Sequence, residues 1–329
     1  MRIVMMGTGT FAEPTFEALI AARENVVGLV TQPDRDTGRK GGSTRQTGKG
    51  MAAIAEDAAV PVIQPESINT PDGLAALKAL APDLLVVAAY GQILKPEVLA
   101  VPPLGAINVH ASLLPKFRGA SPVAAAILAN EHVTGVTIIR ITPGLDAGDM
   151  LAKESLEIHP DETTGELEAR LAVIGARLAL DTVQRLKAGP VTGEPQDESA
   201  VSRAPKLKKE QGLLDWSRPA SEIARVVRAM QPWPTAYTFF HRPGKEPMRV
   251  IISKVRKLGV IEGLPPEPSA AGLILAFEPP RIVVQAHSGS SSIEVLELQP
   301  AGKKKMTAEE FLRGYPVQDG YRFGPEKLD

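Results

Sequence analysis

The stretch Ala106-Ile107-Asn108-Val109-His110-Ala111-Ser112-Leu113-Leu114-Pro115 decides how this chain folds. Its first five residues predict a buried strand, in which Asn108 and His110 lie two positions apart and therefore point to the same side. The Leu-Leu-Pro that follows bends the chain sharply. We therefore expect an amide and an imidazole at the carboxyl end of a strand, which is where ligands bind in open α/β sheets.

Apolar runs on both sides of this strand alternate with helix-like segments. Further strands are predicted at 2–6, 26–31, 60–63, 84–89, 136–141 and 150–158, and helices at 11–22, 51–58, 74–80, 123–129 and 163–187. Unalternating apolar strands separated by helices are typical of a parallel sheet that is covered on both faces. The pattern predicts an α/β fold over residues 1–189, with an open, mostly parallel, Rossmann-like sheet.

The chain changes character after residue 189. Residues 190–205 are rich in proline and glycine and predict a linker. A helix is predicted at 221–230, and short β-like runs between turn residues are predicted at 236–240, 248–255, 272–277, 281–286 and 292–299. This pattern favours a smaller C-terminal domain over 206–329 that forms an OB-like β-barrel.

The composition of the 329 residues excludes several classes of site. There is no cysteine, so disulfides, zinc–thiolate sites and a cysteine nucleophile are excluded. The five histidines include no pair at helical ligand spacing, and we expect no metal. We see no signal peptide and no apolar run long enough to cross a bilayer, so we expect a cytoplasmic protein with no membrane partner.

The overall charge of −1 hides an asymmetry. Residues 206–329 hold 19 Lys and Arg against 14 Asp and Glu, a net charge of +5, and residues 1–205 hold 18 against 24, a net charge of −6. The segment 33–50 is also basic and rich in glycine. Basic regions of this kind fit a polyanionic partner, although a solvated surface or a disordered loop is the common alternative.

A second polar segment, Gly144-Leu145-Asp146-Ala147-Gly148-Asp149, supplies a carboxylate near the neighbouring strand end. Together, Asn108, His110 and Asp146 can hold a carbonyl oxygen, stabilise negative charge on it and manage the proton of an attacking amine. They predict acyl-group transfer without a thiol, a metal or a covalent intermediate. A structural histidine and an aspartate that caps its own turn are the alternatives.

The turn Gly7-Thr8-Gly9-Thr10-Phe11-Ala12 fits the dinucleotide fingerprint, with Asp34 at about the right distance for a ribose contact. An NAD-dependent oxidoreductase is therefore an alternative function, although glycine is common in any such turn. A non-enzymatic RNA-binding protein is a third possibility, which leaves the three polar residues without a purpose.

Motifs along nearly the whole chain carry a resemblance to a known family. They include Ile107–His110, Ser112–Pro115, Gly144–Met150, Gln196-Asp197-Glu198, Pro232-Trp233-Pro234 and Leu298–Lys304. In these segments the chain resembles the methionyl-tRNA formyltransferase family of folate-dependent formyltransferases. It departs from the family pattern at Gly9-Thr10, where proline and an acidic residue are usual, and at Ala111, which is often glycine.

The resemblance implies that a monomer transfers a formyl group to the α-amine of methionyl initiator tRNA, for translation initiation. The donor would be 10-formyltetrahydrofolate, a co-substrate that is not tightly bound. Asn108 and a protonated His110, oriented by Asp146, would stabilise the oxyanion. The implied folate-binding residues are Tyr90, Gly91, Gln92, Ile93, Leu94, Ser112, Leu113, Leu114, Pro115, Gly144 and Leu145. The implied tRNA-binding residues are Arg35, Arg39, Lys40, Arg45, Lys206, Lys208, Lys303 and Lys304.

Three variants of this chemistry stay open at this point. The acceptor amine belongs to a small molecule in one of them, and to a sugar nucleotide in another. In the third, water replaces the amine and the enzyme hydrolyses the formyl donor.

Overall fold

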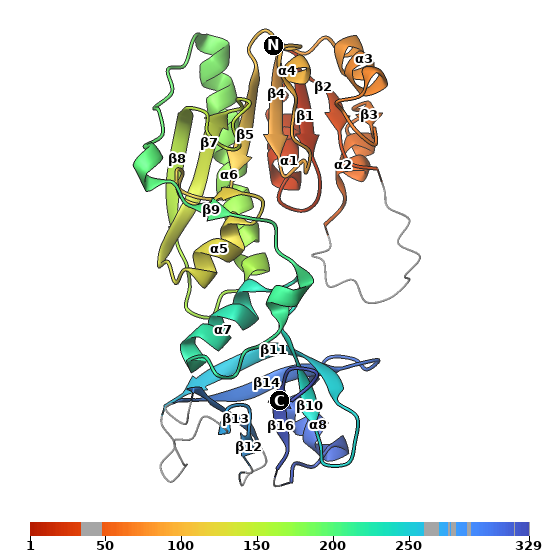
Figure 1. The fold of residues 1–329 in the computed structure, drawn as a ribbon. Coiled ribbons are helices and arrows are strands. Elements are labelled where there is room, and N and C mark those ends of the chain that lie inside the picture. The colour runs from red at the N-terminus through yellow and green to blue at the C-terminus, as the bar shows by residue number, and fades with distance from the viewer. Residues whose placement is uncertain are drawn as a thin grey trace. The chain divides into compact units, whose positions relative to one another are not determined.

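The computed structural model describes residues 1–33, 48–259, 270–275, 277, 281–287, 291–318 and 320–328. The chain divides into two compact units (Figure 1). Unit 1 comprises Met1–Ala126, Glu131–Pro160 and Gly165–Lys206, and unit 2 comprises Ile127–Asn130, Asp161–Thr164 and Leu207–Asp329. Two short segments from the first half of the chain therefore belong to unit 2.

Unit 1 is built on a seven-stranded sheet with the strand order β3-β2-β1-β4-β5-β7-β8. Its strands are β1 (Ile3–Gly7), β2 (Val26–Val30), β3 (Val62–Ile63), β4 (Leu84–Ala88), β5 (Ala106–His110), β7 (Val133–Arg140) and β8 (Met150–Glu157). Pairing is parallel from β3 to β5 and antiparallel from β5 through β7 to β8. The predicted α/β fold with a mostly parallel sheet is confirmed.

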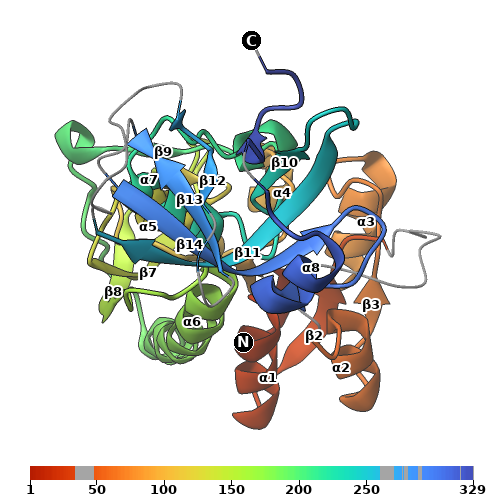
Figure 2. The ribbon, with the colours of Figure 1, turned by 90° about the horizontal axis from the view of Figure 1, so that it is seen from below.

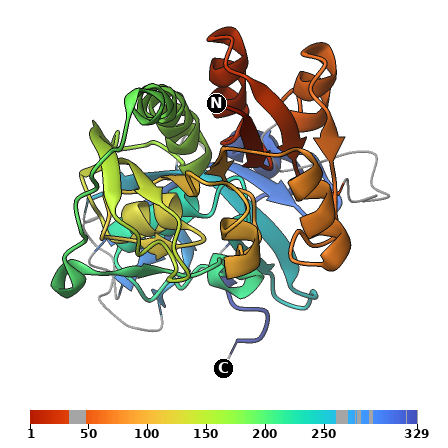
Figure 3. The same cartoon turned by 90° about the horizontal axis from the view of Figure 1, so that it is seen from above.

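Helices cover both faces of this sheet. They are α1 (Glu13–Ala21), α2 (Met51–Asp57), α3 (Pro71–Ala79), α4 (Pro96–Leu99), α5 (Pro122–Leu128) and α6 (Thr164–Ala188). One face carries α1, α2 and α6, and the other carries α3 and α4 (Figure 2, Figure 3). Gly175 lets α6 come close to β5, because a Cβ there would lie 2.6 Å from Val109 Cγ1.

Residues 190–205, which we predicted as a linker, run along unit 1. The segment contains the short helix η1 (Glu198–Ala200) and β9 (Arg203–Ala204), which pairs in parallel with β6 (Arg118–Gly119). Glu194 also exchanges two backbone hydrogen bonds with Met150, both 2.8 Å long. The segment therefore touches the loop that follows β5 and the first residue of β8.

Unit 2 contains an antiparallel sheet that curls into a nearly closed barrel (Figure 2). The strand order is β12-β13-β14-β11-β10-β16, with β15 beside β14. A bridge between Leu273 and Arg322 links the two ends of this order. The strands are β10 (Tyr237–His241), β11 (Met248–Leu258), β12 (Ile274–Leu275), β13 (Ile282–Ala286), β14 (Ser291–Pro300), β15 (Met306–Thr307) and β16 (Arg322–Gly324). The predicted barrel-like second half is confirmed.

The remaining elements of unit 2 are η2 (Lys209–Gly212), α7 (Ala220–Ala229) and α8 (Ala308–Gly314). The sequence pattern predicted α7, whose buried face includes Ile223 and Val227. It did not predict α8 or β16, which have seven and three residues and show too few periods of any pattern. Within the described ranges, no helix has both the length and the apolar character that a membrane span requires.

Candidate active site

Asn108 and His110 lie at the carboxyl end of β5, between two paired strands. Asn108 is in register with Val87 of β4 and Ile139 of β7, and His110 with Thr137 of β7. The Asn108 side chain is half-buried, and no side-chain or backbone group pairs with its amide in the part of the chain that the structure describes. The amide is therefore available to donate hydrogen bonds to a ligand.

The imidazole of His110 is buried between two acceptors. Its Nε2 lies 3.0 Å from the carbonyl oxygen of Phe117, and its Nδ1 lies 3.6 Å from Oδ2 of Asp146. A carbonyl oxygen only accepts hydrogen bonds, so a neutral ring with this geometry carries its proton on Nε2. The lone pair of Nδ1 then faces the carboxylate.

Burial lowers the pKa of His110, against the opposing effects of the Asp146 charge and the Phe117 carbonyl. Because the usual pKa of histidine is about 6.5, a lower value leaves the ring neutral near pH 7. The direction of this pKa favours a neutral ring in the free protein, and the protonated His110 that we predict for the reaction stays a prediction. A neutral imidazole can accept a proton on Nδ1. The resulting cation would donate to both the Phe117 carbonyl and the Asp146 carboxylate.

Asp146 lies in the loop between β7 and β8 with a φ of +49°, in the left-handed region. Its Oδ2 accepts a hydrogen bond of 2.8 Å from the backbone N–H of Gly119. The Nε2 of Gln196 donates to the carbonyl oxygens of Asp146 and Gly148, each at 2.8 Å. The structure thus brings His110 and Asp146 together from two separate parts of the chain.

The implied folate-binding residues differ in how far they are buried. Gly91, Ile93, Gly144 and Leu145 are exposed, whereas Tyr90, Leu94, Ser112 and Leu114 are buried. Burial raises the pKa of Tyr90 to about 12, and the Ser112 hydroxyl donates to the Lys116 carbonyl. Leu113 and Pro115 are half-buried. We expect the buried group to reach a ligand only through its backbone.

Gln92 holds its own loop in place. Its Oε1 accepts from the backbone N–H of Ile68 at 3.0 Å, and its Nε2 donates to the Glu66 carbonyl at 3.0 Å. Both ends of the amide are therefore occupied within the chain.

The implied tRNA-binding residues cannot be compared as one set. Arg35, Arg39, Lys40 and Arg45 lie outside the described residues. Lys206, Lys208, Lys303 and Lys304 are all exposed, the first in unit 1 and the others in unit 2.

Five residues that hold this site together have no role that the sequence predicts. Phe117 and Gly119 contact His110 and Asp146 through their backbones, and Gln196 holds the Asp146 loop. The Ser202 hydroxyl accepts from the N–H of Phe117 at 2.8 Å, and the Thr137 hydroxyl bridges Ser112 and Leu114. Gly119, Thr137 and Gln196 lie in sequence motifs that carry the family resemblance, at 118–122, 134–138 and 196–198, but none of the three had an assigned role.

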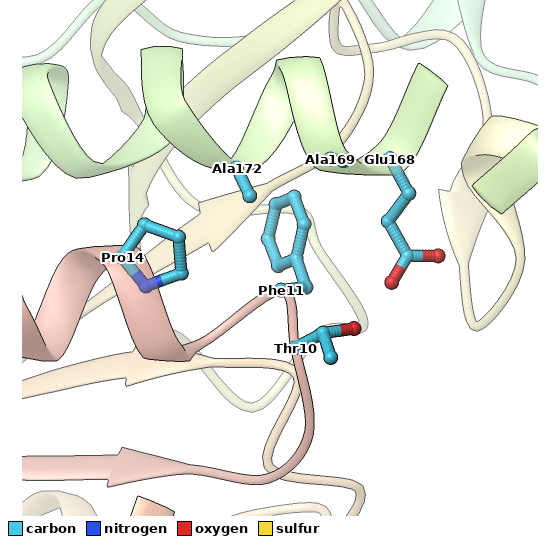
Figure 4. Close-up of a pocket in the computed structure, with 6 residues that line it drawn as sticks. All are labelled: Thr10, Phe11, Pro14, Glu168, Ala169 and Ala172. Carbon is cyan, nitrogen blue, oxygen red and sulfur yellow. The ribbon is translucent and has the colours of Figure 1, made fainter. Parts of the chain in front are cut away.

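A small cavity of about 90 Å³ lies between the β1–α1 turn and α6 (Figure 4). The residues that line it are Thr10, Phe11, Pro14, Glu168, Ala169 and Ala172. Its walls are mostly apolar, and burial raises the pKa of Glu168. A Cβ added at Gly175 would lie 3.9 Å from Cζ of Phe11 and 2.6 Å from Cγ1 of Val109, the residue between Asn108 and His110 in β5. Among the described residues, no group of three or more His, Asp or Glu side chains could hold a metal ion.

Comparison with known proteins places these features in a family. The profile described as "Formyl transferase" matches residues 1–183, and the profile "Formyl transferase, C-terminal domain" matches residues 206–316. A methionyl-tRNA formyltransferase of Desulfotalea psychrophila is 41% identical over 319 residues, covering 96% of this chain and 94% of the relative. The chain belongs to the methionyl-tRNA formyltransferase family.

A second relative extends the match. The methionyl-tRNA formyltransferase of Bacillus subtilis is also 41% identical, over 322 residues that cover 97% of this chain and 96% of the relative. Among solved structures, the sugar 3N-formyl transferase WlaRD matches with a TM-score of 0.64 and 17% identity, covering 92% of this chain and 99% of that one. WlaRD was solved in the presence of dTDP and 5-N-formyl-THF. The formyltransferase family is a transferase family, so an oxidoreductase function is not favoured.

Proposed function

We propose that this chain is an enzyme that transfers the formyl group of 10-formyltetrahydrofolate to the α-amine of methionyl initiator tRNA. The observation that carries the proposal is the arrangement at the end of β5. There, the Asn108 amide, with which no group in the described part of the chain pairs, shares one side of a strand with a buried His110, whose Nδ1 faces Asp146. The full-length relatives named methionyl-tRNA formyltransferase support this choice of substrate.

Each residue has a distinct part in the proposed reaction. Free α-amines have a pKa of about 8, so a useful fraction of the substrate amine is neutral near pH 7. When the amine attacks the formyl carbon, the carbonyl oxygen gains negative charge, and the Asn108 amide donates a hydrogen bond to it. Nδ1 of His110 takes the proton that the amine loses, and Asp146 stabilises the resulting imidazolium. His110 then returns this proton to the folate nitrogen as its bond to the formyl carbon breaks.

We propose that the folate co-substrate lies against exposed apolar side chains in the segments that follow β4 and β7. Ile93, after β4, is 75% exposed, and Leu145, beside Asp146, is 50% exposed. Apolar side chains in this position suit the faces of a flat heterocycle, and backbone groups of Gly91 and Gly144 can hydrogen-bond its edges. We propose that these residues contact the pterin.

We propose that tRNA is bound mainly by the basic second half, as a domain of residues 206–329 that follows a catalytic domain of residues 1–189. Lys208, Lys303 and Lys304 are exposed there and would contact phosphates, which fix position rather than sequence. We extend this role to Lys206 in unit 1 and to the basic segment with Arg35, Arg39, Lys40 and Arg45. All three catalytic residues come from unit 1, so the proposal needs one copy of the chain, acting in the cytoplasm where initiator tRNA is charged.

The test offers labelled 10-formyltetrahydrofolate to the protein together with one acceptor at a time. The acceptors are methionyl initiator tRNA, methionyl elongator tRNA, small amines and sugar-nucleotide amines. Label on initiator tRNA alone supports the proposal, and label on a small amine, a sugar-nucleotide amine or formate overturns it.

His110→Ala should abolish most transfer and leave the Kd for tRNA nearly unchanged, whereas His132→Ala, at an exposed histidine, should behave as wild type.

A further inference from the structure

Gln196 makes three contacts with one amide. Its Nε2 donates to the carbonyl oxygens of Asp146 and Gly148, and its Oε1 accepts from Nε of Arg118 at 3.0 Å. Both hydrogens and the oxygen of this amide are therefore engaged within the chain. Because its partners are two acceptors and one donor, only one orientation of the amide satisfies them.

Arg118 donates to Oε1 of Gln196 and is itself held in place by Glu198. Its guanidinium is buried and forms two hydrogen bonds with Glu198, at 2.8 and 3.3 Å. Its neighbour in β6, Gly119, donates its N–H to the carboxylate of Asp146. The Asp146 loop is thus held at its backbone by Gln196 and at its side chain by the residue next to Arg118.

Asp146 needs such support because its backbone conformation is disfavoured. A positive φ brings Cβ of a non-glycine residue close to the backbone, and such a residue keeps it only when its surroundings hold it there. The loop offers little of its own, since the backbone contact from Ala147 to Gly144 is 3.4 Å long and Leu145 is exposed. The two hydrogen bonds from Gln196 to the loop are shorter, at 2.8 Å each.

We infer that Gln196 is a positioning residue, which holds the 144–148 loop so that the Asp146 carboxylate faces Nδ1 of His110. This inference rests on the proposed function, in which Asp146 stabilises the protonated imidazole. Without Gln196, we expect the backbone of the 144–148 loop to shift and the carboxylate to move away from the ring despite its hydrogen bond from Gly119, so that the proton taken from the amine is no longer stabilised. The step that suffers is the chemical one, since the Gln196 amide is occupied within the chain and does not bind substrate.

The kinetic test compares three variants. A displacement of about 1 Å at a catalytic group can cost about 100-fold in rate, so we expect Gln196→Ala to lower kcat by about that factor with little change in either KM. Gln196→Glu keeps the volume but loses both donors, and should lose as much. Asp197→Ala, which removes the contacts from Asp197 to Ser199 next door, should keep the wild-type kcat. Wild-type kcat in Gln196→Glu, or an equal loss in Asp197→Ala, overturns the inference.

The second test does not depend on activity. The pKa of His110 is measured by NMR in the wild type, Asp146→Asn, Gln196→Ala and the double variant. In the wild-type background, Asp146→Asn removes a charge that raises the pKa of His110, so this pKa should fall. In the Gln196→Ala background the carboxylate is already displaced, so the same change should leave the pKa of His110 unmoved.

An equal shift in both backgrounds overturns the inference whatever the enzyme does. If the shift disappears as expected but the wild type forms no formyl-methionyl-tRNA, the proposed function fails and the role of Gln196 in placing Asp146 stands. Gln196→Asn, which keeps the amide on a shorter side chain, replaces Gln196→Ala in both tests if the alanine variant does not melt cooperatively.

Discussion

The two halves of the candidate active site are held in different ways. His110 ends a strand that is paired on both sides, so the backbone ladder of β4, β5 and β7 fixes its position. Asp146 lies in a loop with a positive φ, and contacts from Gly119 and Gln196, 27 and 50 residues away in the sequence, hold it. A strand end provides a rigid base for one group, whereas the partner group depends on side chains that arrive from elsewhere.

The largest expected effect is a loss of kcat in a variant of β5, the strand that ends at His110. Asn108→Ala removes a donor to the oxyanion, and one such donor is worth about 3 kcal/mol in the activation barrier, or about 100-fold in kcat. The free energy of unfolding should hardly change, because no group within the described ranges pairs with this amide. Steady-state kinetics and urea denaturation measure the two effects. A kcat near that of the wild type would remove Asn108 from the mechanism.

On the loop side, Gly148→Ala should damage stability as well as activity. An added Cβ would lie 1.8 Å from the carbonyl oxygen of Arg140, so the backbone must move. We expect the free energy of unfolding to fall by about 2 kcal/mol and kcat to fall with it, because Asp146 lies two residues away. Urea denaturation checks this.

Gly144→Ala, at the other end of the loop, is the matched control for the free energy of unfolding only, because Gly144 belongs to the proposed pterin contact. Its nearest neighbour would be the Ala147 Cβ at 3.0 Å, in an exposed position where a small shift relieves the contact. If Gly144→Ala and Gly148→Ala lowered the free energy of unfolding equally, the tight packing at Gly148 would not be what holds the loop.

The same contrast explains what the sequence could predict. The strand at 106–110 and its two-residue period were sufficient to place Asn108 and His110 on one side of a sheet edge, and the structure has β5 at those residues. The two-domain architecture followed from the same patterns. The contacts of Gln196 and Ser202 could not be predicted, because they join segments that are far apart in sequence and no local pattern records them.

The lowered pKa of His110 could not be predicted from the sequence, for a related reason. It depends on how much water the folded chain removes from the ring, and a strand-end histidine looks the same in sequence whether it is buried or exposed. Burial at this position lowers the pKa, and the direction opposes the effect expected from Asp146 alone.

The lowered pKa of His110 predicts a pH dependence of stability. In the unfolded chain this ring takes up a proton as the pH falls through about 6.5, whereas the folded chain takes it up only at lower pH. The contribution of the neutral His110 ring to the free energy of unfolding is therefore fully present above pH 6.5. It is lost as the pH falls, by at most about 1.4 kcal/mol for each pH unit between the unfolded and folded pKa values. Urea denaturation from pH 8 to pH 5 should show a shallower loss for His110→Gln than for the wild type. Parallel curves would show that the folded ring titrates normally.

The smallest expected effect on kcat and Tm is that of a variant at Glu198, which supports the 144–148 loop only through Arg118. Glu198 is 74% exposed, and its charge is therefore well screened, although the Arg118 guanidinium holds the pKa of Glu198 below its usual value. Glu198→Gln keeps an oxygen that accepts from Arg118, so we expect kcat and Tm close to those of the wild type at low and high salt. Thermal melts and kinetics at both salt concentrations measure this. A loss as large as that expected for Gln196→Ala would mean that the charge on Glu198 orients Arg118, and that the loop depends on this ion pair more than on the amide between them.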